Sequence, residues 1–393
     1  MRKSKMKILI VSHEYPPIGG GGANACMNLA KEYSKEGNQV TIVTVWFEGE
    51  KELEHKENIT IYRIKAKRKH LEHCVFPEML DYLVKAIPFT ARLQKENAFD
   101  ICQVFFGIPS GPIGLYLKRK YSLPYVIRFG GGDIPGFQDR FSFIYKLLAP
   151  FIISLWKNAD ALVANSQGLK KLAENFYDKK EILIIPNGAN AVDLSQQSYL
   201  DAGKDENIKS ERKIIRLLFV SRLIERKGLQ DILPQLKTIS DKLLNEEKSI
   251  TLDIVGDGPY RETLEQIVKE QGISDLVTFH GQKNKQQLPQ YYSQGDIFLF
   301  PSRKEGMPNA VLEAMSYGIP IIMTPCQGSD ELIDGNGYVS QTSDFEKSIL
   351  QLCTNDKLRE DMGKKSLELV KNKFSWGNTA KMYLEMFDKI VKE

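Results

Sequence analysis

The sequence predicts an α/β protein made of two consecutive domains, each with a parallel β-sheet covered by helices on both faces. Three observations support this fold class. Strand-like and helix-like segments alternate along almost the whole chain, which is the pattern of parallel sheets with crossover helices. The chain has 393 residues, more than one hydrophobic core usually organises. A polar segment poor in apolar residues also interrupts the alternation near the middle.

The first half contains seven short segments rich in β-branched and aromatic residues, which we expect to be strands. They span residues 7–12, 39–45, 59–64, 101–105, 125–129, 161–164 and 182–185. Longer amphipathic stretches lie between many of them, and the clearest predicted helices are 23–36 and 167–176. This half therefore predicts one Rossmann-like domain over residues 1–190.

The second half repeats the pattern after the polar segment 189–212, whose Asn, Gln, Asp, Lys and Ser content is typical of a linker. Its expected strands are 215–221, 251–255, 277–280, 297–300 and 319–323, and its clearest expected helices are 260–271, 311–317 and 379–391. This half predicts a second Rossmann-like domain over residues 191–374. In open parallel sheets ligands bind beyond the carboxyl ends of the strands, so the residues that follow the strands are the candidates for function.

Composition places the chain among globular proteins, with 42% hydrophobic and 26% charged residues. Its five cysteines are scattered and form no CxxC pair, which favours reduced thiols over a disulfide framework or a metal site. The first residues lead straight into a strand-like segment without a cleavage-site pattern. The longest apolar run, Leu147–Trp156, is too short to span a bilayer. We therefore expect a cytoplasmic protein.

Basic residues are concentrated in the first half of the chain. Residues 1–190 contain 27 Lys and Arg against 19 Asp and Glu, whereas the remainder contains 27 against 31. The densest basic group is Arg63, Lys65, Lys67, Arg68 and Lys69, and a mixed apolar and basic stretch, 75–92, follows it. Such a distribution favours an anionic partner or an ordinary solvated loop. No nucleic-acid-binding motif accompanies it, so we expect an acidic membrane surface on the inner face as the partner, and no nucleic acid.

The segment 296–324 is the most informative for function. A strand-like run ends at Pro301, a polar loop containing Glu305 follows, and Pro308 stands where the first turn of a helix would begin. Free N–H groups at a helix start bind anions such as diphosphates. Glu313 lies eight residues after Glu305, inside the apolar helix pattern. Carboxylates beside such a site can accept hydrogen bonds from sugar or ribose hydroxyls, although most Glu side chains are simply solvated.

This segment, EGMPNAVLEAM, resembles the E-x7-E signature of retaining glycosyltransferases of family 4. The resemblance extends over nearly the whole chain and is strongest between Arg222 and Glu331. It implies the GT-B fold, with two Rossmann-like domains facing a cleft and a C-terminal helix, about 375–393, crossing back to the N-terminal domain. The family uses its first domain for the acceptor and its second for the nucleotide-sugar donor. It also implies that Glu305 contacts the donor sugar and Glu313 the ribose.

Further motifs after strands fit the same resemblance. Four glycines, 19–22, follow the first strand and allow close backbone approach to a ligand, although they match neither GxGxxG nor a P-loop. Arg222 and Lys227 follow the first strand of the second half, where two cations could neutralise a departing diphosphate. The resemblance also implies a donor-binding role for Gly20, Gly21, Gly256, Gly258, His280, Gly306, Met307, Pro308 and Asn309. It places Asn187 in a PNG element at the interdomain hinge.

The first half lacks a histidine that is common in the family. Many members carry a His that touches the donor sugar, and that position here is Gly130, while Asp133 is retained. Arg128 and Asp133 are candidates for acceptor or sugar binding instead. His13, beside the glycine loop, is as consistent with a structural role as with a functional one. The predicted catalytic set is Arg222, Lys227, Glu305 and Asp133, and the predicted acceptor-side set is His13, Arg128 and Asn187.

No Asp-x-Asp pair occurs in the chain, so we expect catalysis without a metal or other cofactor. The sequence predicts a retaining glycosyltransferase that moves a sugar from a nucleotide sugar, with UDP as the default nucleotide, to a saccharide or lipid-linked saccharide in cell-surface glycan synthesis. Three alternatives remain open. They are a GT-B sugar-nucleotide epimerase, a non-catalytic nucleotide-sugar-binding subunit, and a dinucleotide-dependent oxidoreductase with Glu48 as its ribose-binding acid.

Overall fold

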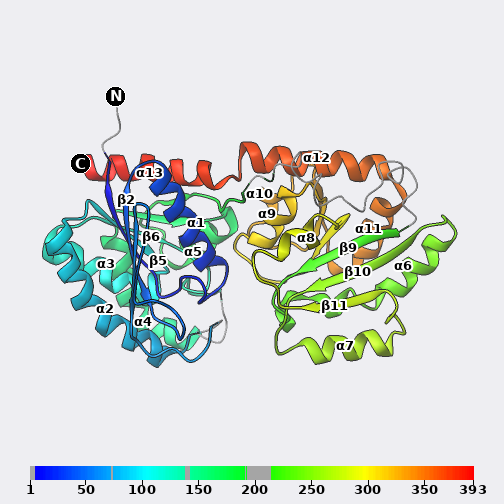
Figure 1. The fold of residues 1–393 in the computed structure, drawn as a ribbon, viewed down its shortest axis with the longest axis horizontal. Coiled ribbons are helices and arrows are strands. Elements are labelled where there is room, and N and C mark those ends of the chain that lie inside the picture. Colours follow the sequence, from blue (N-terminus) through cyan, green and yellow to red (C-terminus); the bar gives the residue numbers. More distant parts are fainter. Residues whose placement is uncertain (1–4, 72–73, 138–141, 191, 193–213) are drawn as a thin grey trace. The chain divides into compact units, whose positions relative to one another are not determined.

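The computed structural model describes residues 5–71, 74–137, 142–190, 192 and 214–393. The chain folds into two compact units. The N-terminal unit comprises Met1–Gly188 together with Trp376–Glu393, and the C-terminal unit comprises Ala189–Ser375. Most of the predicted linker, 189–212, lies outside the described residues. Both units are α/β (Figure 1), which confirms the predicted fold class.

The N-terminal unit is built around an eight-stranded sheet in the order β3-β4-β2-β1-β5-β6-β7-β8. Only the pairing of β3 with β4 is antiparallel. Its strands are β1 (Lys7–Val11), β2 (Gln39–Val45), β3 (Leu53–Lys56), β4 (Ile59–Ile64), β5 (Ile101–Phe105), β6 (Tyr125–Arg128), β7 (Ala161–Ala164) and β8 (Ile182–Ile184). The central strands β5, β6 and β7 are buried along their whole length, as expected for a parallel sheet covered on both faces.

Helices cover the two faces of this sheet in separate groups. Residues of α2 (Phe76–Asn97), α3 (Gly107–Tyr121), α4 (Ser142–Asn158) and α5 (Gln167–Phe176) pack into one core. The other face is covered by α1 (Gly21–Lys35) and the C-terminal helix α13 (Trp376–Lys392). Figure 1 shows α13 beside α1, and Tyr33 of α1 and Phe387 of α13 are in edge-to-face contact at 5.8 Å. The predicted return of the C-terminal helix to the N-terminal domain is therefore confirmed.

The C-terminal unit contains a six-stranded parallel sheet in the order β11-β10-β9-β12-β13-β14. Its strands are β9 (Ile214–Val220), β10 (Ser249–Val255), β11 (Val277–Gly281), β12 (Ile297–Phe300), β13 (Ile321–Met323) and β14 (Gly337–Val339). The first strand of the unit, β9, lies in the middle of the sheet, between β10 and β12. The strand order reverses at this point, and such a switch point is where open α/β sheets bind ligands.

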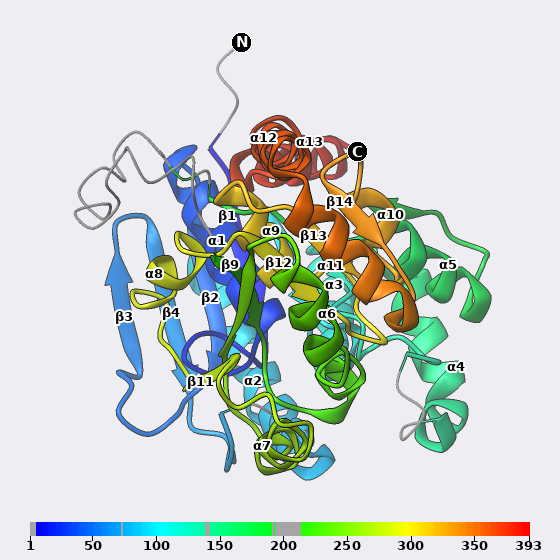
Figure 2. The same cartoon turned by 90° about the vertical axis from the view of Figure 1, so that its right-hand side faces the viewer.

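Two apolar cores hold helices against this sheet. One core contains residues of α6 (Gln235–Leu244), α7 (Arg261–Glu270) and α11 (Phe345–Thr354). The other contains residues of α8 (Leu288–Tyr292), α9 (Asn309–Ser316), α10 (Ser329–Leu332) and α12 (Asp356–Asn372). Figure 2 shows α6 and α11 on one side of β9 and β12 and α8 on the other. The described part of the unit also contains the short 3-10 turns Glu225–Lys227, Leu229–Asp231 and Thr342–Asp344.

Some elements differ from the sequence-based expectation. The strands β3 and β14 were not predicted, because β3 is a polar edge strand and β14 has only three residues. The stretch 75–92 is most of a 22-residue helix, α2, which carries Pro88 in its interior. The helix after β12 begins at Asn309, so Pro308 is its N-cap residue and not its first helical residue.

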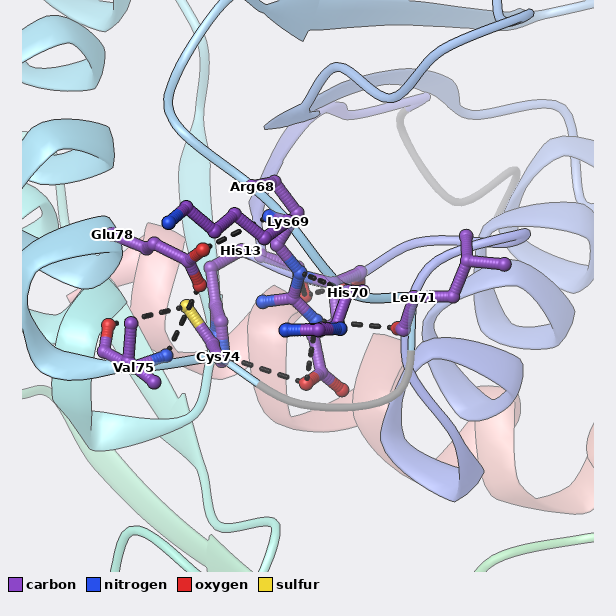
Figure 3. Close-up of polar contacts among 10 residues, drawn as sticks. His13, Arg68, Lys69, His70, Leu71, Cys74, Val75 and Glu78 are labelled. Atoms are coloured by element: carbon purple, nitrogen blue, oxygen red, sulfur yellow. Dashed lines mark hydrogen bonds and ion pairs between the residues drawn. The ribbon is translucent and has the colours of Figure 1, made fainter. Parts of the chain in front are cut away.

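Two cationic side chains of the basic group Arg63–Lys69 are buried, whereas Lys65, Lys67 and Lys69 are exposed. The Arg63 side chain is only 4% exposed and pairs with Glu50 and Glu54. The Arg68 side chain is 1% exposed and donates to the carbonyl oxygens of His70 and Leu71 (Figure 3). These two cations are therefore internal, and the expectation that this group binds a membrane is wrong for them.

Candidate active site

The strongest concentration of predicted site residues lies at the carboxyl edge of the C-terminal sheet. Arg222 and Lys227 follow β9, and Glu305 follows the neighbouring strand β12. The Lys227 ammonium donates to Glu305 Oε1 at 2.7 Å, and the Arg226 guanidinium lies 3.6 Å from the same oxygen. Arg222 is exposed, and its guanidinium has no hydrogen-bond or ion-pair partner among the residues that the structure describes. The structure thus brings one free cation and a cation–carboxylate pair to one edge.

The loop around Glu305 is held by polar contacts within the loop and with the segment after β13. Ser302 donates to Glu305 Oε1 at 2.9 Å, and Gln327 Oε1 accepts from the Glu305 N–H at 3.2 Å. Thr324 donates to the Ser302 carbonyl oxygen at 2.6 Å. Met307 and Pro308, the last residues before α9, are both buried. These hydrogen bonds and the burial of Met307 and Pro308 fix the position of the loop, and therefore also that of the first residues of α9.

Electrostatics at this edge are dominated by burial and by the cations. Burial alone would raise the pKa of Glu305, but the Lys227 and Arg226 cations outweigh it and hold that pKa below its usual range. Burial lowers the pKa of Lys227, and the nearby Arg226 and Arg222 cations act in the same direction against Glu305. Glu305 is therefore an ionised hydrogen-bond acceptor, and the Lys227 side chain, only 12% exposed, is a cation that an additional anion would stabilise.

Glu313 occupies a different environment within helix α9. Its Oε2 accepts from the Tyr292 hydroxyl at 3.0 Å. Burial raises the pKa of Glu313, against the hydrogen bond from Tyr292. The predicted site acid is thus not a solvated surface residue, because Tyr292 holds it in a defined orientation.

The turn after β10 approaches the Arg222 loop very closely. A Cβ on Gly256 would lie 1.8 Å from the Ser221 carbonyl oxygen, and one on Gly258 would lie 2.3 Å from that of Leu223. Gly256 N–H donates to the Gly281 carbonyl oxygen at 2.9 Å, next to His280, whose Nε2 lies 2.6 Å from Asp253 Oδ1. The predicted donor-side residues after β9, β10 and β11 therefore share one edge.

The predicted site residues of the N-terminal unit are mostly internal. Arg128 is 2% exposed, and its guanidinium donates to the Asn187 side chain. Asp133 is 3% exposed, and its carboxylate accepts from the N–H groups of Gly107 and Gly130. These three side chains hold the unit together, and their burial disfavours direct contact with an acceptor.

His13 is buried beside the glycine loop. Its Nε2 lies 3.6 Å from Glu14, and Figure 3 draws it together with Arg68 and Cys74. Burial, with a contribution from the Arg68 cation, lowers the pKa of His13 to about 3. The imidazole is therefore neutral at physiological pH. Within the glycine loop, Gly20 and Gly21 stand at the start of α1, and a Cβ on Gly20 would meet open space.

Several side chains at the site were not singled out from the sequence, namely Ser302, Gln327 and Tyr292. Ser302 lies two residues after the end of β12, so inspection of post-strand residues could have found it. Gln327 and Tyr292 come from separate segments without such a signal. Among the described residues no group of three or more His, Cys, Asp or Glu could hold a metal ion. None of the helices that the structure describes is both long enough and apolar enough to cross a membrane.

Comparison with known proteins identifies the class. The family model described as "Glycosyltransferase Family 4" matches residues 19–192, and the model "Glycosyl transferases group 1" matches residues 202–368. Together they span most of both units. The chain therefore belongs to the group 1, family 4 glycosyltransferases, and it is a retaining GT-B-type enzyme of EC class 2.4.

Curated relatives extend over most of the chain at low identity. An uncharacterized glycosyltransferase of Methanocaldococcus jannaschii is 25% identical over 98% of this chain and 99% of its own length. Alpha-monoglucosyldiacylglycerol synthase of Streptococcus pneumoniae is 23% identical over 81% of this chain and 70% of its own length.

Solved structures show the same fold over the full length. Sucrose-phosphate synthase from Thermosynechococcus elongatus gives a TM-score of 0.81 at 19% identity, covering 99% of this chain and 100% of that chain. The Anabaena protein HepE in complex with UDP-glucose gives 0.69 at 16% identity, covering 98% and 100%.

Proposed function

We propose that this glycosyltransferase moves a sugar from a UDP-sugar to a saccharide or lipid-linked saccharide during cell-surface glycan synthesis. The observation that carries the proposal is the cluster at the C-terminal sheet edge. There an exposed Arg222, a nearly buried Lys227 and an ionised Glu305 come together on the loops after β9 and β12. Cations suit a leaving diphosphate, and an ionised carboxylate beside them suits the sugar attached to it.

In this proposal the diphosphate of the donor binds Arg222, Lys227 and backbone N–H groups at the start of α9. A helix start favours anions. Glu305 accepts hydrogen bonds from the donor sugar and Glu313 from the ribose. Lys227 is paired with Glu305 in the structure. A bound diphosphate would add negative charge beside this cation without removing its first partner.

The proposed chemical step is a substitution at the anomeric carbon of the donor. An acceptor hydroxyl oxygen forms the new bond to that carbon, on the face from which the nucleotide departs. The bond from the anomeric carbon to the β-phosphate oxygen breaks, and the released diphosphate takes the hydroxyl proton. Arg222 and Lys227 stabilise the charge that develops on the leaving group. Such preorganised electrostatic stabilisation is usually the largest single contribution to catalysis.

Two of the similar proteins support the substrate assignment. HepE was solved with UDP-glucose, which favours a UDP-sugar as donor for this chain. The S. pneumoniae relative is a monoglucosyldiacylglycerol synthase, which favours an acceptor carried on a lipid. We therefore expect the protein to act in the cytoplasm, at the inner face of the membrane.

Helix α4 offers a better membrane-facing surface than the Arg63–Lys69 group. Phe143 and Leu147 are 79% and 73% exposed, and Phe151, one turn further on, is 43% exposed. These three residues are spaced four apart, so they form one apolar stripe on the helix. Exposed basic residues accompany the stripe on α4 and on the adjacent helix α3: Lys146, Arg119 and Lys120. An apolar stripe beside cations suits an anionic bilayer surface.

Co-sedimentation with vesicles tests this surface. We expect binding to phosphatidylcholine–phosphatidylglycerol vesicles and little binding to phosphatidylcholine alone. The double variant Phe143→Ser/Leu147→Ser should lose most of that binding, whereas Lys65→Ala should retain it. Equal binding of both variants to the anionic vesicles would refute the assignment of α4.

A calorimetric and thermal-shift screen tests the proposed donor. UDP-glucose, UDP-galactose, UDP-N-acetylglucosamine, GDP-mannose and ADP-glucose are compared, each with and without EDTA. A cognate donor well above its Kd stabilises the protein by RT ln(1 + [L]/Kd), and we expect the same shift with EDTA present. Loss of binding on chelation, restored by Mg²⁺, would contradict the metal-independent site. A shift with GDP- or ADP-sugars alone would contradict UDP.

Product analysis separates transfer from the alternatives. The proposal requires a glycosylated acceptor in assays with membrane lipid extracts or oligosaccharides. An epimerase would instead release free epimerised sugar. A non-catalytic binding subunit would give neither transfer nor slow donor hydrolysis.

A further inference from the structure

Phe106 has a backbone conformation that residues with a side chain rarely adopt. It follows β5 directly and is the N-cap residue of α3, with φ +68° and ψ +120°. Positive φ brings Cβ close to the backbone, so it is common only for glycine and occasional for Asn and Asp. Such strain persists where the surroundings hold it, and it clusters at ligand sites.

Hydrogen bonds on both sides of Phe106 maintain this conformation. Its own N–H donates to the Arg128 carbonyl oxygen at 3.0 Å. The next N–H, that of Gly107, donates to Asp133 Oδ2 at 2.6 Å, and Asp133 Oδ1 accepts from Gly130 N–H at 2.8 Å. The buried Asp133 carboxylate therefore ties the loop after β5 to the loop after β6, and Phe106 is held between these contacts.

The ring of Phe106 occupies the space between two glycine-containing loops. A Cβ on Gly22 would lie 2.3 Å from its Cζ, and a Cβ on Gly130 would lie 2.2 Å from its Cε1. The His13 ring meets it edge-on, with centroids 4.9 Å apart. The ring is nevertheless only partly buried. Glycine at positions 22 and 130 is thus what makes room for the aromatic ring at the carboxyl edge of the N-terminal sheet.

This geometry excludes a side chain at position 130. The sequence places the family histidine at this position, but any side chain there would collide with Phe106. His13 is a weak base for proton transfer, because burial lowers its pKa to about 3. The Phe106 ring therefore occupies the space that a side chain at position 130 would need.

We infer that the Phe106 ring is a binding platform for a pyranose ring, stacked against the C–H groups of the sugar. The face of an aromatic ring is electron-rich, and the C–H groups of a pyranose face carry partial positive charge. The carboxyl edge of a parallel sheet is where ligands bind. The inference rests on the proposed function for the source of the sugar, which is either the donor hexose or the acceptor saccharide.

Three substitutions at position 106 distinguish stacking of the ring on a sugar from packing of the side chain within the protein. Phe106→Tyr keeps the aromatic face, Phe106→Leu keeps an apolar side chain without it, and Phe106→Gly removes the side chain and adopts φ +68° without strain. We expect Leu and Gly to lower kcat/KM roughly tenfold, the scale of one aromatic contact. The kcat/KM of Phe106→Tyr should stay within about twofold of that of the native protein. The Kd for UDP should not change in any variant, because the proposed diphosphate site lies in the other unit.

Two activity measurements identify the sugar. A matching loss in UDP-glucose hydrolysis and in transfer assigns the platform to the donor hexose. A loss in transfer alone, with raised KM for the acceptor, assigns it to the acceptor saccharide. Native kinetics of both reactions in folded Phe106→Leu would overturn the inference, as would a change confined to thermal stability.

A third measurement does not need catalysis. Saturation-transfer NMR is recorded with the methyl glycosides of glucose, galactose, mannose and N-acetylglucosamine. We expect contacts from one sugar face with the native protein and with Phe106→Tyr, reduced in Phe106→Leu. Signals that are equal in Phe106→Leu, or absent for all four sugars with the native protein, would contradict the platform. Because this assay needs no nucleotide, it distinguishes failure of the platform from failure of the proposed donor.

Discussion

The carboxyl edges of the two sheets are chemically opposite. At the edge of the C-terminal sheet, charged side chains meet on adjacent loops, with Arg222 exposed and Lys227 paired to Glu305. At the edge of the N-terminal sheet the ionisable groups are withdrawn into the fold, since Asp133 and Arg128 are buried and bonded within the unit. There the aromatic ring of Phe106 is only partly buried, between glycines.

This difference indicates a division of labour between the units. A diphosphate needs fixed cations and N–H groups, and the C-terminal edge supplies them. A sugar ring needs shape and an apolar face as much as charge, and the N-terminal edge supplies that. We therefore propose that the C-terminal unit stabilises the leaving group.

The largest expected effect is on turnover when a cation of the C-terminal edge is removed. Arg222→Ala or Lys227→Ala should lower kcat/KM at least about 100-fold, the scale of losing one preorganised electrostatic contact. The matched control is Arg216→Ala. Arg216 lies on the same strand, β9, and is exposed, and its guanidinium bonds Gln294. If steady-state kinetics showed the same loss of kcat/KM for Arg216→Ala as for the other two variants, the assignment of Arg222 and Lys227 to the site would be contradicted.

The second effect is a pH dependence of stability from the N-terminal edge. His13 has a folded pKa of about 3 against 6.5 in the unfolded chain. The unfolded state therefore binds the proton first, and stability is lost as pH falls below 6.5. Between pH 7 and pH 5 the loss should be about 2 kcal/mol from this group. Urea unfolding at several pH values measures it.

Two variants isolate the histidine contribution. His13→Gln should flatten this part of the pH profile, and His55→Gln should leave it unchanged, because His55 is exposed on β3. A profile that is identical in all three proteins would show that the N-terminal edge is not closed to protons as the structure indicates.

The third effect concerns the ribose side of the C-terminal edge. Glu313→Gln should weaken uridine and UDP binding by roughly tenfold, since a charged hydrogen-bond acceptor is lost. Tyr292→Phe should have a smaller effect, because it removes only the group that orients Glu313. Calorimetric titration ranks the two variants. A larger loss in Tyr292→Phe would mean that the pair is structural and does not contact the nucleoside.

The smallest effect is expected at Lys65 in the basic group of the N-terminal unit. Its ammonium pairs with Glu52, and both side chains are about 60% exposed. Such a surface pair contributes under about 1 kcal/mol. Lys65→Ala should leave stability and vesicle binding close to those of the native protein. Loss of vesicle binding in this variant would restore the Arg63–Lys69 group as the membrane contact.

The sequence predicted the sheets well, because buried parallel strands are short apolar runs with clear ends. Segments such as 39–45 and 297–300 match β2 and β12 residue for residue. It missed β3 and β14, which lie at sheet edges and lack that pattern. Helix α2 was also missed, because its Pro88 and mixed composition resemble a loop. Hydrophobic periodicity identifies strands that are buried on both faces, but it gives little information about strands at the edges of a sheet.

The candidate site was predictable where its residues lie on the loops that follow neighbouring parallel strands. Lys227 and Glu305 are 78 residues apart, yet both follow neighbouring strands, and they form an ion pair. Phe106 could not be predicted in the same way. Its role depends on a backbone angle and on the space above Gly22 and Gly130, and no residue pattern encodes either of these.

The most direct test of the central claim is to titrate UDP and uridine separately into native, Arg222→Ala and Lys227→Ala proteins by calorimetry. If these cations hold the diphosphate, both substitutions weaken UDP binding at least about tenfold and leave uridine binding unchanged. Native-like affinity for UDP in both variants, or an equal loss for uridine, would contradict the account.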